Sequence, residues 1–256
     1  MMAPKEKIKK ILLIRPDMIG DTALITPALS LLRQHFPNTN ITLLIQSYPK
    51  ELFQNHPDVN EIIIDKIAEG KVCNFLSFLR YVKEIKEKNF DLAIAFYNEF
   101  PYALLIRLAG IPYRIGDRSK IIFGWMYNVK VYQKWADLTK HEVEHNLELL
   151  KPLGINPQRS FPKLKILLSD EQKNYLKTFL VTNNINEKDL VVGINPGIGR
   201  TSRAWFPQRY AKVIDFLVEN FSAKIIITGT EKDKVAVKEI KNHAKNEKSI
   251  IDLAGV

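Results

Sequence analysis

The chain alternates short, continuously apolar runs with longer segments of helical periodicity, and this alternation limits its fold more than any other feature. The first example is residues 9–29, KKILLIRPDMIGDTALITPAL, in which the apolar run 11–14 leads into a polar elbow and then a helical pattern. An apolar run without alternation is typical of a strand that is covered on both faces of a parallel sheet. Strands that alternate with helices predict such a sheet, with right-handed crossovers.

The alternation occurs in two blocks, which predict two α/β domains, residues 1–160 and 161–256. The first block has predicted strands at 11–14, 41–45, 61–64, 92–96 and 113–115, and predicted helices at 22–35, 50–55, 73–88, 102–109 and 142–150. A linker-like stretch, INPQRSFP at 155–162, follows. The second block has predicted strands at 190–194, 224–228 and 249–253, and predicted helices at 208–221 and 233–245.

The second domain has only three predicted strands, and the sequence ends where another helix is expected. A unit below about 100 residues buries little apolar surface. We therefore expect this domain to be incomplete in this chain. Either a partner supplies the rest or, as we favour, the chain is a truncated version of a longer protein.

Composition excludes several classes of protein. No apolar run approaches the ~20 residues of a membrane span, and the run after the basic N-terminus is shorter than the core of a signal peptide. We therefore expect a cytoplasmic protein. Cys73 is the only cysteine, which excludes an internal disulfide and a cysteine-based zinc site. It lies in an apolar helical pattern, which favours a buried structural thiol over a nucleophile.

The formal net charge of +10 favours an anionic partner. Nucleic acid, an acidic membrane surface and a phosphorylated substrate all fit this charge. The sequence has no helix-turn-helix, RNP-type or zinc-finger pattern, so we do not expect nucleic acid.

Asp21 follows a glycine at the predicted start of a helix and has two interpretations. As an N-cap or first-turn carboxylate it would stabilise the helix by roughly 0.3–1 kcal/mol, and capping base rates favour this interpretation. Alternatively, it is a general base exposed at the carboxyl ends of the strands, where ligands of open α/β sheets bind.

A second polar loop, GINPGIGRTSRAWFP at 193–207, follows a strand of the second domain. Glycines let the backbone approach an anion, and helix amides and arginines bind phosphate oxygens. The loop matches neither a Walker loop nor the GxGxxG fingerprint. A phosphate site and a plain surface turn are equally compatible with it. At a similar strand end, residues 228–231, an ordinary turn and helix cap is favoured.

Two further segments have competing interpretations. HEVEH at 141–145 fits the HExxH zinc pattern, but no third ligand is evident in an α/β context, so no metal site is expected. An acceptor-facing or interdomain role for His141 and His145 is favoured over zinc.

The aromatic and basic segment 121–135 suits interfacial membrane contact or carbohydrate stacking. Packing of these side chains beneath a long loop explains the segment equally well and is favoured.

Three motifs, in this order, resemble glycosyltransferase family 9, the heptosyltransferases of lipopolysaccharide inner-core assembly. They are IGD at 19–21 with TPAL at 26–29, HEVEHNL at 141–147 before LGI at 153–155, and NPG at 195–197 continuing to RAWFP at 203–207. The resemblance implies a GT-B fold. This fold has two Rossmann-like domains, the first binding mainly the acceptor and the second the nucleotide-sugar.

The resemblance also implies roles for individual residues. Asp21 matches the family's catalytic base, and Arg203 stands where the family has a basic residue near the donor diphosphate. The implied donor-binding residues are Gly197, Thr201, Ser202 and Arg203, and the implied acceptor-side residues are Arg15, Gly20 and His141. Family members carry a further donor-binding loop, similar to Gly-Asn-Asp-Ser-Gly, beyond the last strand. The sequence ends before it, so we expect donor to bind weakly to this chain.

The implied reaction is an inverting, metal-independent and cofactor-free transfer of a sugar, heptose, from an ADP-heptose-like donor to an anionic glycolipid acceptor of the lipopolysaccharide-core type. The basic charge fits an acceptor at the inner face of the cytoplasmic membrane, with peripheral contact of the protein there. The alternative hypothesis is a non-catalytic sugar- or nucleotide-binding remnant without a complete donor site.

Overall fold

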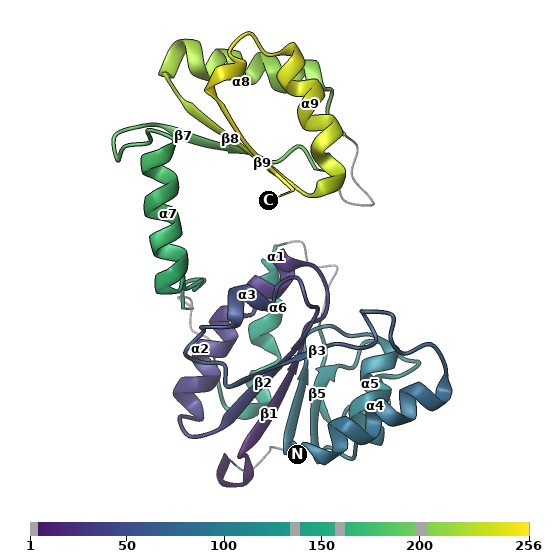
Figure 1. Ribbon diagram of the computed structural model, residues 1–256. Helices are drawn as coiled ribbons and strands as arrows, with labels where there is room; N and C mark the ends of the chain where they lie inside the picture. The colour runs from purple at the N-terminus through teal and green to yellow at the C-terminus, as the bar shows by residue number, and fades with distance from the viewer. Residues whose placement is uncertain (1–4, 134–138, 157–161, 198–203, 256) are drawn as a thin grey trace. The chain divides into compact units, whose positions relative to one another are not determined.

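The computed structural model describes residues 5–133, 139–156, 162–197 and 204–255. The chain forms two compact units, Met1–Ser169 and Asp170–Val256 (Figure 1). The boundary predicted at residue 160 lies outside the described residues. None of the helices in the described ranges is long and apolar enough to cross a membrane.

The first unit is built on a parallel sheet of six strands in the order β3-β2-β1-β4-β5-β6. The strands are β1 (Lys10–Ile14), β2 (Asn40–Ile45), β3 (Glu61–Ile64), β4 (Leu92–Ala95), β5 (Tyr113–Asp117) and β6 (Val129–Val131). This is the strand order of Rossmann-type sheets, in which the direction of strand addition reverses between the first and fourth strands. The sequence predicted five of these strands and missed β6, which has three residues.

Helices cover both faces of this sheet (Figure 1). They are α1 (Ile19–Ala23), α2 (Thr26–His35), α3 (Lys50–Phe53), α4 (Phe75–Glu87), α5 (Phe100–Leu108) and α6 (Glu142–Glu148). Side chains of α2 and α6 belong to one apolar core, and side chains of α4 and α5 to the other. Along β1, Ile11 and Leu13 face the first core and Leu12 and Ile14 the second. All four are fully buried, as the continuous apolar run predicted.

The helix predicted at 22–35 is two helices in the structure, α1 and α2. Pro27 has no N–H to donate to the carbonyl of Ala23, so the helical ladder cannot run through this point. The hydroxyl of Thr26 bonds to that carbonyl instead, at 3.0 Å. The break leaves Asp21 in a short helix of its own, α1.

The prediction that Cys73 is a buried thiol was wrong. Asn74 is the N-cap of α4, so Cys73 precedes the helix and its side chain is exposed. The apolar periodicity that seemed to include Cys73 begins two residues later, at Phe75.

The second unit has a parallel sheet in the order β7-β8-β9 within its described residues. Its strands are β7 (Val191–Ile194), β8 (Lys224–Gly229) and β9 (Ile250–Ala254), and its helices are α7 (Asp170–Thr182), α8 (Pro207–Phe221) and α9 (Lys234–His243). Helices α8 and α9 pack against each other and share an apolar core with the sheet, on the same side of it in Figure 1.

Candidate active site

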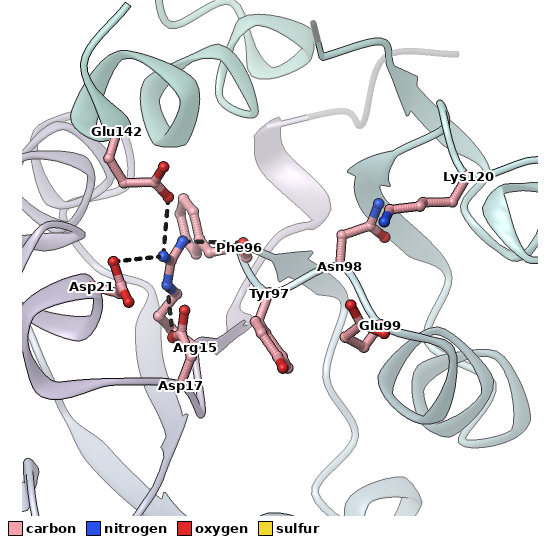
Figure 2. A pocket seen from close by; sticks show the side chains of 9 residues that line it. All are labelled: Arg15, Asp17, Asp21, Phe96, Tyr97, Asn98, Glu99, Lys120 and Glu142. Atoms are coloured by element: carbon pink, nitrogen blue, oxygen red, sulfur yellow. Dashed lines mark hydrogen bonds and ion pairs between the residues drawn. The ribbon is translucent and has the colours of Figure 1, made fainter. Parts of the chain in front are cut away.

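A pocket of about 330 Å³ lies at the carboxyl ends of β1 and β4 (Figure 2). These two strands are neighbours at the point where the strand order reverses, which is where open α/β sheets bind their ligands. The lining side chains come from the elbow after β1, the loop after β4, the turn after β5 and the first residue of α6; they are Arg15, Asp17, Asp21, Phe96, Tyr97, Asn98, Glu99, Lys120 and Glu142.

Arg15 is the central residue of this pocket and is 4% exposed. Its guanidinium donates to the carbonyl of Phe96 at 3.1 Å and to Oε1 of Glu142 at 3.0 Å. It also pairs with the carboxylates of Asp17 at 2.8 Å and Asp21 at 3.6 Å (Figure 2). The buried guanidinium of Arg15 therefore links the elbow after β1 to the loop after β4, to α1 and to α6. It lies beside the carboxylates of Asp17, Asp21 and Glu142.

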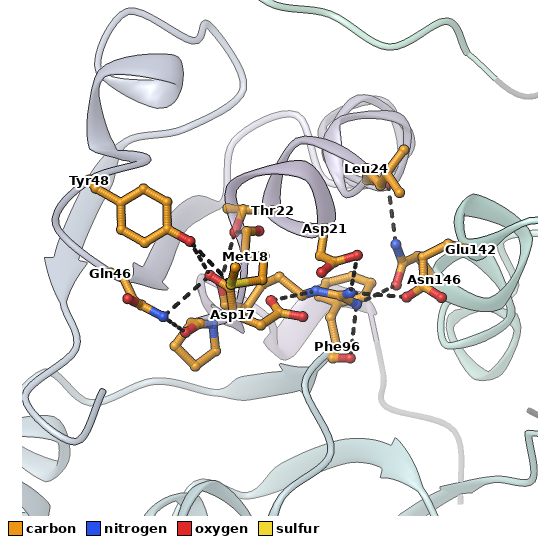
Figure 3. Close-up of polar contacts among 12 residues, drawn as sticks. Asp17, Met18, Asp21, Thr22, Leu24, Gln46, Tyr48, Phe96, Glu142 and Asn146 are labelled. Atoms are coloured by element: carbon orange, nitrogen blue, oxygen red, sulfur yellow. Dashed lines mark hydrogen bonds and ion pairs between the residues drawn. The ribbon is translucent and has the colours of Figure 1, made fainter. Parts of the chain in front are cut away.

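Neighbouring side chains hold the backbone of the elbow, residues 15–21, in place (Figure 3). The hydroxyl of Thr22 donates to the carbonyl of Met18 at 3.0 Å, and the hydroxyl of Tyr48 donates to that of Asp17 at 3.1 Å. Gln46 donates to the carbonyl of Pro16. These bonds tie the elbow to α1 and to the segment after β2, so the acidic side chains are held on an ordered backbone.

Asp21 occupies the third position of α1, and its side chain is 41% exposed. The N-cap of α1 is Met18, and no side chain caps the helix, so Asp21 is a first-turn carboxylate and not an N-cap. The guanidinium of Arg15 lies 3.6 Å from its carboxylate. The carboxylate is thus held beside a cation but remains open to a ligand in the pocket.

Asp17 shares Arg15 with Asp21, but it is buried more deeply, with 15% of its side chain exposed. Burial raises the pKa of Asp17 from 3.8 to about 6, the pairing with Arg15 lowers it, and the nearby charge of Asp21 raises it. The pocket therefore contains one carboxylic acid whose proton is exchanged close to neutral pH.

The raised pKa of Asp17 predicts a pH-dependent effect of the substitution Asp17→Asn on stability. Below pH 3.8 Asp17 is protonated in both the folded and the unfolded state. As the pH rises to about 6, the folded state holds this proton more tightly, so the free energy of unfolding falls. Asn cannot ionise, so the variant should gain stability over the wild type between pH 4 and pH 8, by up to about 3 kcal/mol.

Thermal unfolding of both proteins at several pH values measures this difference. Asp252→Asn is the matched control, because Asp252 is an exposed carboxylate on β9 of the second unit, outside the pocket. A difference between wild type and Asp17→Asn that stays constant with pH would contradict the raised pKa.

The HEVEH segment forms the start of α6. The imidazole of His141 caps this helix by accepting from the amide of Val143 at 3.2 Å, and His141 is not among the pocket residues. His145 is buried, whereas Glu142 between them lines the pocket. In the part of the chain that the structure describes, no three His, Cys, Asp or Glu side chains form a metal-binding group.

Gly20 lies in α1 beside Asp21, and a Cβ atom placed on it would have no neighbour within 4 Å. Its position is therefore next to the pocket, but the structure gives no steric reason for glycine there. Arg15 and Asp21 are the two predicted residues of the first unit that the pocket brings together.

A second pocket, of about 710 Å³, lies at the carboxyl ends of β7 and β8. It is lined by Asn195, Gly197, Thr228, Gly229, Thr230, Lys232 and Asp233. A Cβ atom on Gly197 would lie 3.0 Å from both Oδ1 of Asn195 and Oδ2 of Asp233, so a side chain would crowd this pocket. The predicted residues Thr201, Ser202 and Arg203 lie outside the described residues.

The predicted turn and helix cap at residues 228–231 is confirmed. Thr230 is the N-cap of a 3-10 helix, Glu231–Asp233, and forms a capping box with Asp233. The carboxylate of Asp233 accepts from both the amide and the hydroxyl of Thr230 at 2.7 Å, and these bonds hold its pKa below the usual value. Asp233 therefore lines the second pocket as an ionised carboxylate.

Comparison with solved structures identifies the class of fold. The structure superposes on a glycosyl transferase family 9 protein from Veillonella parvula with a TM-score of 0.79, at 21% identity, covering 96% of this chain and 69% of that one. It superposes on the Escherichia coli ADP-heptose lps heptosyltransferase II with a TM-score of 0.72, also at 21% identity, covering 96% and 72%. These likenesses, with the two α/β units, define a GT-B fold with Rossmann-like domains.

The family follows from the sequence. Residues 78–256 match the model of glycosyltransferase family 9 (heptosyltransferase), so the chain belongs to this family. Lipopolysaccharide heptosyltransferase 3 of Escherichia coli is 26% identical over 242 residues, which are 92% of this chain and 68% of that protein. The predicted fold class and family are both confirmed, and the protein is a glycosyltransferase.

Proposed function

We propose that the protein is an inverting, metal-independent transferase that moves heptose from an ADP-heptose-like donor to an anionic glycolipid of the lipopolysaccharide core. The observation that carries the proposal is the Asp21 carboxylate, which has 41% of its side chain exposed. It lies in the pocket at the carboxyl ends of β1 and β4, which we call the switch-point pocket. Relatives named lipopolysaccharide heptosyltransferase support the choice of sugar and acceptor. The enzyme would act in the cytoplasm, in peripheral contact with the inner face of the membrane.

In the proposed reaction Asp21 removes the proton from an acceptor hydroxyl as its oxygen attacks the anomeric carbon. The bond between that carbon and the diphosphate oxygen breaks on the opposite face, so the configuration inverts and the nucleoside diphosphate leaves with the electron pair. Arg15 would balance the charge of Asp21 before the proton moves, because the two groups are 3.6 Å apart. Lys120, which is exposed in the same pocket, is suited to an anionic group of the acceptor.

The leaving diphosphate would bind in the second unit. We assign Thr201, Ser202 and Arg203 to it on the family resemblance and because they follow in the sequence on Gly197, which lines the second pocket. Backbone amides, hydroxyls and a guanidinium stabilise phosphate oxygens as negative charge develops on them. Gly197 leaves room for the diphosphate to approach the backbone.

Nucleotide binding tests this assignment. Loss of one charge-assisted contact costs about 1.5–3 kcal/mol, so Arg203→Ala should weaken ADP binding by about 10-fold to 100-fold. Isothermal titration calorimetry with ADP measures the effect. Arg80→Ala is the matched control, because Arg80 is an exposed arginine of α4 in the first unit. Equal ADP affinity of Arg203→Ala and the wild type would remove Arg203 from the donor site.

Turnover separates the enzyme from the alternative function. The proposal requires transfer of heptose from ADP-heptose to a lipopolysaccharide-core acceptor, which mass spectrometry of the product detects. Binding of nucleotide without any transfer would instead support a non-catalytic sugar- or nucleotide-binding protein.

A further inference from the structure

Exposed apolar side chains gather on three segments of the first unit. They belong to the first turns of α4, the start of α5 and the turn after β5; we call them the apolar surface, and they are Phe75, Leu76, Leu79, Phe100, Ile121, Ile122 and Trp125. The two consecutive isoleucines stand out, because Ile121 is 93% exposed and Ile122 is 83% exposed. Single exposed apolar residues are normal, but a contiguous set indicates an interaction site.

The three segments pack against one another. The ring of Phe100 meets the ring of Phe123 edge-on at 6.2 Å, which joins the start of α5 to the turn after β5. The guanidinium of Arg107 on α5 lies 5.8 Å from the centre of the Trp125 ring. Between α4 and α5 a groove of about 390 Å³ is lined mainly by Phe75, Phe78 and other apolar residues, with the exposed Cys73 at its edge.

Packing within the unit explains only part of the 121–135 segment. Phe123 and Tyr127 are buried in the core beneath α5, as packing beneath a loop predicted. These buried residues anchor the turn, while Ile121, Ile122 and Trp125 remain exposed. Lys134 and Trp135 of the segment lie outside the described residues. Packing within this unit therefore leaves these side chains uncovered.

The apolar surface borders the switch-point pocket. Glu99 lines the pocket and the next residue, Phe100, belongs to the apolar surface. Lys120 lines the pocket and the next residue, Ile121, also belongs to it. A bilayer in contact with the apolar surface would therefore lie beside the pocket. The polar head of an amphiphile could then enter the pocket while its apolar part stays in the bilayer.

Charges beside the apolar surface favour an anionic bilayer as its partner. Arg80, Arg107 and Lys120 are exposed on the same three segments, and Glu99 faces the pocket. Arginine and lysine beside exposed aliphatic and Trp side chains is the composition of surfaces that lie in the interface of an anionic membrane. Trp is suited to the headgroup level because its ring is apolar and its N–H is polar.

We propose that the apolar surface docks on a bilayer of anionic phospholipid and presents the pocket of Asp21 to the headgroups. This inference rests on the proposed function for the membrane contact and the identity of the acceptor, and it assigns that contact to named residues. Ile121 and Ile122 enter the interface, and Arg80 and Arg107 contact lipid phosphates. The pocket then meets an acceptor without extracting it from the membrane.

Sedimentation with vesicles tests docking without any turnover. The full chain should bind phosphatidylcholine vesicles that contain phosphatidylglycerol more tightly than vesicles of phosphatidylcholine alone, and added salt should weaken this preference. The variant Ile121→Ser/Ile122→Ser/Trp125→Ser should bind at least about tenfold more weakly. Val181→Ser/Val235→Ser is the control, because those side chains are 76% and 71% exposed in the second unit.

The sole cysteine gives a second measurement that locates the contact. An environment-sensitive fluorophore on Cys73 should shift to the blue when vesicles are added, because Cys73 lines the groove of the apolar surface. The same fluorophore in Cys73→Ser/Gln34→Cys should not respond, since Gln34 is exposed on α2, which packs on the opposite face of the sheet.

The outcomes separate the possible partners and the two proposals. Equal vesicle binding of the triple variant and the wild type would overturn docking through this surface. A dimer in analytical ultracentrifugation that the triple variant loses, without vesicle binding, would assign the surface to a second copy instead. Transfer to a deacylated, water-soluble acceptor tests the proposed function separately, and the triple variant should retain it.

Discussion

Asp21→Asn lowers the turnover number of heptose transfer by about 10²–10⁴-fold, the typical contribution of a positioned general base. Asn keeps the volume of the side chain but cannot accept the proton of an acceptor hydroxyl. The free energy of unfolding should change little. The Asp21 carboxylate lies 3.6 Å from Arg15 and its side chain is 41% exposed. Ion pairs of such exposed carboxylates contribute at most about 1 kcal/mol. Initial rates at saturating donor and acceptor measure the loss.

Glu99→Gln is the matched control for this substitution. Glu99 also lines the pocket, so its variant loses a carboxylate without losing the proposed base. We expect less than a tenfold change in turnover for Glu99→Gln, and unchanged ADP affinity for Asp21→Asn. Turnover of Asp21→Asn equal to that of the wild type would remove Asp21 from the mechanism.

Local sequence patterns predicted most of the fold because each buried strand is a short apolar run. The predictions at 11–14 and 61–64 fall on β1 and β3 with little or no shift in their ends. Errors arose where tertiary contacts decide the structure. The strand β6 has three residues and exists because it pairs with β5. The break before Pro27 was readable from the missing N–H of proline.

The site was only partly predictable, because its residues come from four separate segments. The elbow indicated Asp21, and the family resemblance added Arg15. Asp17 lies in the same elbow, where its acidic side chain after a strand was a usable signal. Glu142 was overlooked because HEVEH drew attention to its histidines. Nothing near Lys120 in the sequence indicates that the turn after β5 reaches the pocket.

Arg15→Met destabilises the first unit by about 3–5 kcal/mol, because removal of one partner leaves buried charge uncompensated. Met has a similar length but no charge, so Asp17 and Glu142 lose their cation and the carbonyl of Phe96 loses its donor. A loss of this size lowers the melting temperature by on the order of 10 °C. Arg15→Lys should recover only part of it, because an ammonium cannot reach several acceptors in the plane of the guanidinium fork.

Hydrogen exchange locates the effect of Arg15→Met. Amides of β1 and β4 should exchange faster, while amides of β8 in the second compact unit serve as the internal control.

Asp17 determines how the loss of stability in Arg15→Met depends on pH. Arg15 lowers the pKa of Asp17, so without Arg15 that pKa rises further above about 6, and at pH 5 the carboxyl is neutral in the folded state. The destabilisation should therefore be smaller at pH 5 than at pH 8. For the same reason, Arg15→Met/Asp17→Asn should regain part of the loss at pH 8 and little at pH 5. If the double variant were no more stable than Arg15→Met at pH 8, buried charge on Asp17 would not be the cause of the loss.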